Sequence, residues 1–188
     1  MRRFHRAAYL TAALCLLLIA VPSVALCASH VEATLSVPEK RDAEHPAIVS
    51  LELRNSGDEP VSILKWNTPF VQSGGRLPKP LFVVRDAEGR DVRYRGTFVN
   101  FAGVVMDSFI VLNPGEVLRK DIDLIEEYRY GDGGAFTVTY TLNLSQTPDP
   151  NLTSEAERRA FYPSSQGEVE SNSVIIEIDG PTKPFSVG

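Results

Sequence analysis

Apolar and polar residues alternate over short stretches of the chain, which is the period of a β-strand with one buried face. The clearest stretch lies at 136–144, where aromatic and aliphatic residues alternate with threonine and asparagine. Similar patterns predict further strands at 31–37, 49–54, 60–66, 81–85, 91–95, 108–112, 116–124 and 174–178. Seven to nine short strands without a long helical period predict an all-β protein, an antiparallel immunoglobulin-like β-sandwich.

Turn-forming residues separate several of these stretches. Asn55-Ser56-Gly57-Asp58 follows the second predicted strand. Asp86-Ala87-Glu88-Gly89-Arg90 and Asn113-Pro114-Gly115 each lie between two strands and supply a glycine where a tight turn needs a positive φ. The sequence therefore predicts a hairpin at 81–95 and a second tight turn at 113–115.

One short helix is expected in a late loop. Ser154 followed by Glu157 has the spacing of a capping box, which predicts a polar helix that ends near Ala160. This helix lies within a long irregular stretch at 145–171. Such stretches are uncommon in compact domains, and they are either functional or mobile.

The N-terminus has the pattern of a secretory signal. Three arginines precede an uncharged run from Ala7 to Val21, and Pro22 then leads into small residues. Cleavage after Ala25, Cys27 or Ala28 fits the pattern. An uncleaved membrane anchor is the second interpretation, and a lipoprotein is a third that the leucine before Cys27 disfavours. The predicted organisation is a signal peptide at 1–28, a sandwich domain at 29–180 and a flexible tail at 181–188, in a secreted or periplasmic protein.

Removal of this leader changes the composition. The whole chain has 188 residues and a formal charge of −5. Residues 29–188 retain 16 basic and 24 acidic residues, a charge of −8, which disfavours nucleic acid as a partner. Cys15 and Cys27 are the only cysteines, so the sandwich must fold without an internal disulfide.

Metal-binding patterns are weak. His30 and His45 are the only histidines after the leader, and no His-Glu-x-x-His sequence is present. Residues 86–91 resemble a calcium loop faintly, but they lack its distal glutamate and fit a hairpin turn better. We expect no metal and no cofactor.

Catalytic patterns are equally weak. Ser62 and Lys65 have the Ser-x-x-Lys spacing, but on a strand these two positions face opposite sides. Asp121 and Asp123 share a strand face and alternate with apolar residues, as expected for a solvated face. The sequence therefore predicts a protein that is not an enzyme.

Two stretches are candidates for binding another protein. Trp66 lies at the end of a predicted strand and fits either a core position or a recognition site. It leads into the Pro- and Gly-containing loop 67–80, and a second stretch, Phe98–Val105, is apolar and uncharged. The candidate contact residues are Asn67, Thr68, Pro69, Phe70, Phe98 and Phe101.

A family resemblance begins at the same residues. The string Leu64-Lys65-Trp66-Asn67-Thr68-Pro69 resembles the N-terminal β-sandwich region that precedes the catalytic domain of bacterial deuterolysin-like and peptidyl-Lys metalloendopeptidases. Further similar positions follow in order at 82, 86–89, 94–96, 112–115, 121–124, 128 and 134–140. The stretch 97–103 departs from the family because it is more apolar, and the chain contains no catalytic zinc motif.

The resemblance implies a pro-region or accessory region without its catalytic domain. We therefore expect a secreted or periplasmic, non-catalytic binding module associated with a protease, as an inhibitor, a pro-region-like chaperone or a docking module. Its expected partner is another protein, for which a secreted metalloprotease is one candidate, with membrane contact only if the leader is uncleaved. The alternative is a structural or adhesive cell-surface module unrelated to proteolysis.

Overall fold

The computed structural model describes residues 30–39, 45–71 and 75–180. The predicted leader at 1–28 and the predicted tail at 181–188 lie outside these residues. The described chain is nearly all-β, its strands pair antiparallel, and it contains one short α-helix, which confirms the predicted fold class. The arrangement is consistent with an immunoglobulin-like sandwich.

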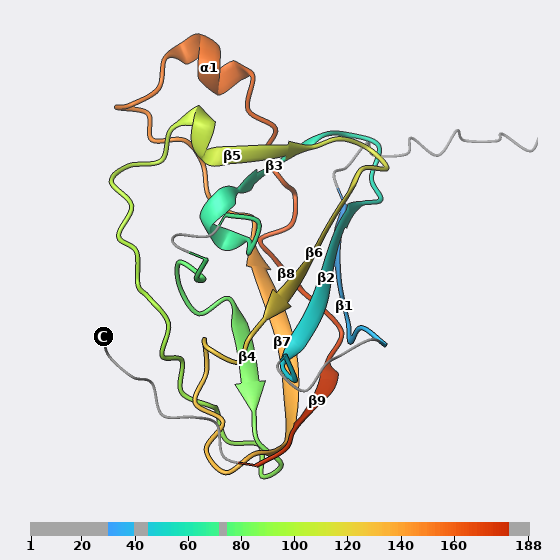
Figure 1. Cartoon of the computed structure of the whole chain (residues 1–188). Helices are drawn as coiled ribbons and strands as arrows, with labels where there is room; N and C mark the ends of the chain where they lie inside the picture. Colours follow the sequence, from blue (N-terminus) through green and yellow to red (C-terminus); the bar gives the residue numbers. More distant parts are fainter. Residues whose placement is uncertain (1–29, 40–44, 72–74, 181–188) are drawn as a thin grey trace, which may run out of the picture.

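Within the described residues, nine strands and three short helical segments follow one another (Figure 1). Their bounds are β1 Val31–Ser36, β2 Ile48–Asn55, β3 Val61–Leu64, η1 Lys65–Asn67, β4 Phe82–Arg85, η2 Met106–Ser108, β5 Phe109–Leu112, β6 Val117–Asp123, β7 Gly134–Asn143, α1 Glu155–Arg159, β8 Glu168–Glu170 and β9 Val174–Ile178.

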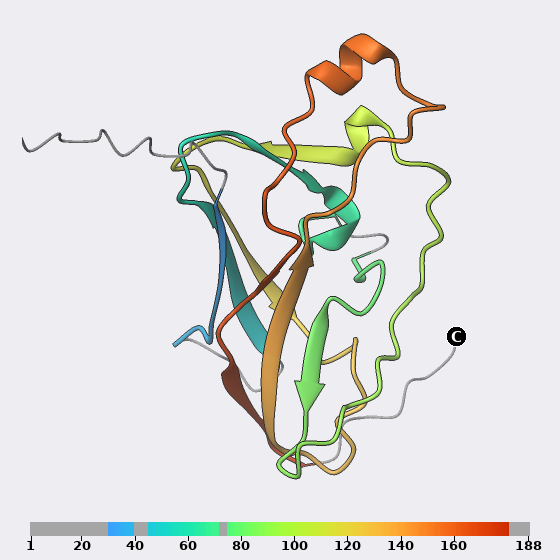
Figure 2. The same ribbon diagram turned by 180° about the vertical axis from the view of Figure 1, so that it is seen from behind.

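The strands form two main layers and a short third sheet. One layer has the order β1-β2-β6, and the other is built on β7, which pairs with β4 on one side and with β8 and β9 on the other. The pair β3-β5 lies across one end of the molecule, with α1 beyond it (Figure 1, Figure 2).

The core lies between these layers, where the alternating apolar residues face each other. Leu51 and Leu53 of β2 are fully buried, as are Val138 and Tyr140 of β7. All belong to one contiguous cluster of buried side chains. Burial of a large aliphatic side chain stabilises the fold by about 1.5–3 kcal/mol, so the period-two pattern of the sequence is the main source of stability.

Three elements differ from the sequence-based expectation. The predicted strand at 91–95 forms only isolated bridges at Asp91 and Tyr94, because it leaves β4 and crosses to Tyr128. The predicted strand at 60–66 ends at Leu64, where the Lys65 carbonyl accepts bonds from Thr68 and closes the turn η1. Strand β8 was not predicted, since Val169 is its only apolar residue.

The late helix agrees with the prediction. Ser154 caps α1, and its side chain and that of Glu157 accept each other's backbone N–H groups. The Glu157 carboxyl accepts from the Ser154 hydroxyl and from the Ser154 N–H, and these two bonds, the hydroxyl first, lower the pKa of this exposed group. The surrounding stretch packs on the sandwich, since the Phe161 ring meets the Phe109 ring edge-on, with centroids 5.0 Å apart.

The Tyr128 side chain forms hydrogen bonds with the backbone of Phe82, the first residue of β4. Its hydroxyl donates to the Phe82 carbonyl (2.5 Å) and accepts from the Phe82 N–H (3.2 Å). The Tyr128→Phe variant would lose both bonds in a buried site, and we expect a free energy of unfolding lower by about 1–2 kcal/mol. Urea unfolding measures this, and a Tyr162→Phe variant, at an exposed tyrosine, serves as control. Equal stability of the two variants would contradict the prediction.

The described part of the chain contains no helix long and apolar enough to cross a membrane.

Candidate functional site

The apolar stretch 97–105 runs along one side of the molecule and is called the strap below. Both views show it as an irregular segment at an outer edge, between the 86–91 turn and η2 (Figure 1, Figure 2). Its inner residues Val99 and Phe101 are half-buried, whereas Phe98, Asn100 and Ala102 are exposed. This alternation is that of an extended segment lying with one face on the sandwich.

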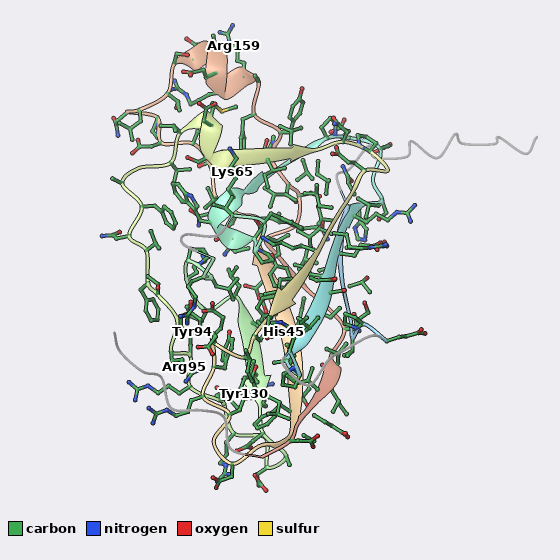
Figure 3. The ribbon with its side chains drawn as sticks, in the orientation of Figure 1. His45, Lys65, Tyr94, Arg95, Tyr130 and Arg159 are labelled. Carbon is green, nitrogen blue, oxygen red and sulfur yellow. The ribbon has the colours of Figure 1, made fainter. Side chains whose placement is uncertain are left out.

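The lower end of the strap is held by Tyr94 and by the segment before β4. The Tyr94 hydroxyl lies 2.9 Å from the Leu77 carbonyl and 3.1 Å from the Thr97 carbonyl. The Val99 N–H donates to the Pro78 carbonyl at 2.9 Å. The Phe98 ring lies edge-on against the Tyr94 ring, with centroids 5.5 Å apart. Tyr94 is labelled in Figure 3.

The middle of the strap is held by Trp66. The rings of Trp66 and Phe101 stack in parallel, with centroids 3.8 Å apart and planes 6° apart. Both residues are half-buried. The two stretches that the sequence analysis selected, 35 residues apart, therefore meet at one ring stack, and Trp66 serves as a platform for the strap rather than as a core residue.

The upper end of the strap contacts the late loop. The Asp149 N–H donates to the Val104 carbonyl at 2.7 Å. Gly103 has a φ of +79°, and a Cβ there would lie 2.3 Å from a methyl carbon of Leu152. Glycine at this position allows both the positive φ and the close approach of the loop. The loop therefore holds the upper end of the strap.

The candidate contact residues do not share one exposed surface. Asn67, Thr68 and Pro69 are buried, and Asn67 joins three neighbours: its amide donates to the Asn143 carbonyl (2.8 Å), its side-chain oxygen accepts from Lys79, and its carbonyl accepts from Tyr140. These three residues build the corner beneath the strap. Phe70 and Phe101 are half-buried, and Phe98 is 73% exposed.

A partly buried ion pair lies under the base of the strap. Arg76 Nε and Glu127 Oε1 are 2.7 Å apart, and the Leu77 N–H donates to the same oxygen at 3.3 Å. The hydrogen bond to Glu127 raises the pKa of Arg76, and burial raises the pKa of Tyr94 beside them. Sequence reasoning missed this pair, because a glutamate in the turn after β6 has no local pattern that indicates burial.

Gly96 lies against this pair. A Cβ at Gly96 would be 2.1 Å from Glu127 Oε2 and 2.3 Å from the Tyr94 hydroxyl. The close approach of this backbone fixes the point at which the strap begins.

The two histidines within the described residues, His30 and His45, each lie near a carboxylate. His45 Nδ1 lies 2.6 Å from Asp123 Oδ2, and His30 Nε2 lies 3.8 Å from Glu32. Within 30–39, 45–71 and 75–180, no group of three or more histidine, cysteine, aspartate or glutamate side chains is placed to hold a metal ion. Asp86 accepts the N–H groups of Glu88 and Arg90 within its own turn, and these bonds, the Arg90 N–H first, lower its pKa.

The residues of the weak catalytic patterns take part in structural hydrogen bonds. The Ser62 hydroxyl is buried and accepts from the Tyr162 N–H at 3.1 Å, whereas Lys65 donates to the Asp107 carbonyl. Asp121 accepts from the Ser50 hydroxyl, in a pair across β2 and β6. Each side chain has a partner that accounts for its position, and the strap remains the most distinctive candidate site.

Comparison with known proteins links the chain to proteases. It is 28% identical over 165 residues to an extracellular protease of Aeromonas hydrophila, which covers 88% of this chain and 43% of that protein. It is 25% identical over 134 residues to a neutral protease 2 homolog of Blastomyces gilchristii, which covers 70% of this chain and 33% of that protein. The chain thus spans less than half the length of these relatives.

Other comparisons add little. No known family profile matches the chain. A solved structure of the putative ApaA protein from Bordetella pertussis aligns over 80% of this chain and 95% of its own, with 16% identity and a TM-score of 0.36. The strap and its anchors therefore belong to a chain that resembles part of two larger proteases.

Proposed function

We propose that this chain is a secreted or periplasmic, non-catalytic module that binds a protease, and that the strap is its main contact. The similarity to part of two proteases supports the class of partner, and the name of the first relative supports an extracellular location. The observation that carries the proposal is the strap itself. It is an uncharged segment with an exposed aromatic ring, and it is held in place at three levels.

Fixation of the strap favours binding. A flexible loop loses conformational entropy when a partner orders it, about 0.5–1.5 kcal/mol for each mobile side chain at an interface, whereas a fixed segment avoids much of that loss. Tyr94, Trp66 and Leu152 hold the strap from the body of the protein. Phe98 then offers a large apolar side chain to a pocket of the partner.

The role follows from what a protease cleft accepts. An extended segment is the conformation in which proteases bind polypeptides, because their clefts recognise backbone groups and alternate side chains. A strap held in that conformation fits an inhibitor or a pro-region-like module. It fits an adhesive surface less well, because no feature of the strap is specific to adhesion.

Inhibition assays test this proposal. The purified chain is mixed with the active A. hydrophila extracellular protease, and residual activity is measured against chain concentration. We expect inhibition at micromolar concentration or below, weakened about tenfold or more by Phe98→Ala, because hot-spot aromatic residues contribute about 2 kcal/mol or more to binding.

The matched control is Ile175→Ala. Ile175 is a large apolar residue of β9 that is 64% exposed and lies outside the strap. It should leave inhibition unchanged. Neither inhibition nor a complex at micromolar concentration would overturn the proposal and favour the structural or adhesive alternative.

A further inference from the structure

We infer that the strap binds its partner by strand addition: the free backbone edge at Phe98, Asn100 and Ala102 pairs with an extended strand that lines the protease cleft. This inference rests on the proposed function and adds the mode of binding. It assigns the specificity of the contact to backbone groups as well as to the Phe98 ring.

The two ordered contacts of the lower strap show which edge is used. The Thr97 carbonyl accepts from Tyr94, and the Val99 N–H donates to Pro78, so the odd-numbered residues direct their backbone groups to the edge beside Tyr94 and Pro78. In an extended segment, alternate residues direct N–H and C=O to opposite edges. The backbone groups of Phe98, Asn100 and Ala102 therefore lie on the opposite edge, away from Tyr94 and Pro78.

This outer edge is unpaired. Among residues 30–39, 45–71 and 75–180, no hydrogen bond joins the backbone N–H or C=O of Phe98, Asn100 or Ala102. The side chains of the same three residues are exposed. Edge strands with unpaired backbone groups are ready templates for pairing with another chain.

The length of this edge is set by two glycines. Gly96 lies against Glu127 and Tyr94 where the strap begins, and Gly103 turns the chain with a φ of +79° where the edge ends. Beyond it, the Val104 carbonyl is already paired with the Asp149 N–H. The free edge between these fixed ends therefore consists of three alternate residues, Phe98, Asn100 and Ala102.

The chemistry of the strap indicates the partner's cleft. Residues 96–106 carry no charge. Charged groups in a partner's cleft would therefore lose their water on binding and gain no oppositely charged partner from the strap. The partner surface that fits is an extended strand with free N–H and C=O groups and an apolar pocket at the position of Phe98. Proteases that bind extended polypeptides offer such an edge.

Proline substitution separates backbone pairing from side-chain contact. Asn100→Pro removes the amide donor on the outer edge, whereas Asn100→Ala removes the side chain and keeps the donor. Against the A. hydrophila protease we expect Asn100→Pro to raise the inhibition constant about tenfold or more, and Asn100→Ala to change it less than about threefold. The fluorescence of Trp66, stacked on Phe101, reports whether each variant keeps the strap in place.

Amide hydrogen exchange provides a second readout that does not depend on variants. In the complex, strand addition should slow exchange at Phe98, Asn100 and Ala102 more than at Phe101, whose N–H belongs to the other edge of the strap. Covering of the strap by side chains alone would slow exchange without this alternation.

The outcomes distinguish the two proposals. Inhibition by Asn100→Pro equal to that by the unmodified chain, with Trp66 fluorescence retained, overturns strand addition and leaves the proposed function standing. Uniform exchange across 98–102 in the complex also overturns it. Absence of any complex overturns the proposed function, and strand addition to a protease with it.

Discussion

Asn55→Ala should lower the free energy of unfolding by about 3 kcal/mol, because this buried side chain makes three hydrogen bonds. Asn55 is fully buried at the end of β2. Its amide donates to the Glu59 carbonyl (2.7 Å) and the Leu112 carbonyl (2.9 Å), and its side-chain oxygen accepts from the Gly57 N–H (3.0 Å). The side chain thus joins the 56–60 turn to the end of β5.

Denaturant unfolding measures this effect, and Asn113→Ala is the matched control. Asn113 is exposed, and its side chain donates only to Glu116, so its removal should change the free energy of unfolding by less than about 1 kcal/mol. Asn55→Asp should be at least as unstable as Asn55→Ala, because it keeps the acceptor but loses both donors and buries a charge. An Asn55→Ala variant as stable as Asn113→Ala would show that the buried bonds contribute little.

Gly96→Ala should also lower the free energy of unfolding by about 3 kcal/mol, at the upper end of the usual cost of overpacking. The added Cβ would lie 2.1 Å from Glu127 Oε2 and 2.4 Å from Tyr94 Cζ. Both neighbours are held, Glu127 by Arg76 and Tyr94 by its bonds to Leu77 and Thr97, so neither moves without breaking a contact. The same variant should weaken protease inhibition, because it displaces the base of the strap.

Gly167→Ala is the control for this effect. Gly167, like Gly96, has no positive φ, but nothing lies within 4 Å of its added Cβ. Its substitution should be neutral or slightly stabilising, since alanine reduces the entropy of the unfolded chain. Equal stability of Gly96→Ala and Gly167→Ala, by thermal or urea unfolding, would contradict the close packing at the strap base.

Features with a local pattern could be predicted from the sequence. The strand at 136–144 is present as β7, the strand at 174–178 is β9, and the cap at Ser154 begins α1. Each depends on neighbouring residues only, because side-chain alternation and cap hydrogen bonds repeat within a few positions. The prediction of a strand at 91–95 was wrong because the pairing there is not local: Tyr94 pairs with Tyr128, which is distant in sequence.

The candidate site could be predicted only in part. The sequence indicated Phe98 and Phe101 as apolar residues of an uncharged stretch, and the structure places one in solvent and one on Trp66. It gave no means of separating them from Asn67, which has a buried polar side chain held by Asn143 and Lys79. Exposure depends on which segments pack together, and residue type alone does not determine that.

The sequence by itself determined the all-β class, the turns between strands and the uncharged character of residues 96–106. Only the tertiary structure decided that this stretch becomes a pinned strap, with Trp66 behind it and the Arg76–Glu127 pair beneath its base. The physical reason is the range of the interactions. Alternation and turn preferences act over two to four residues. Ring stacking and the ion pair instead join segments 35 to 51 residues apart, which meet only when the two layers close over the core.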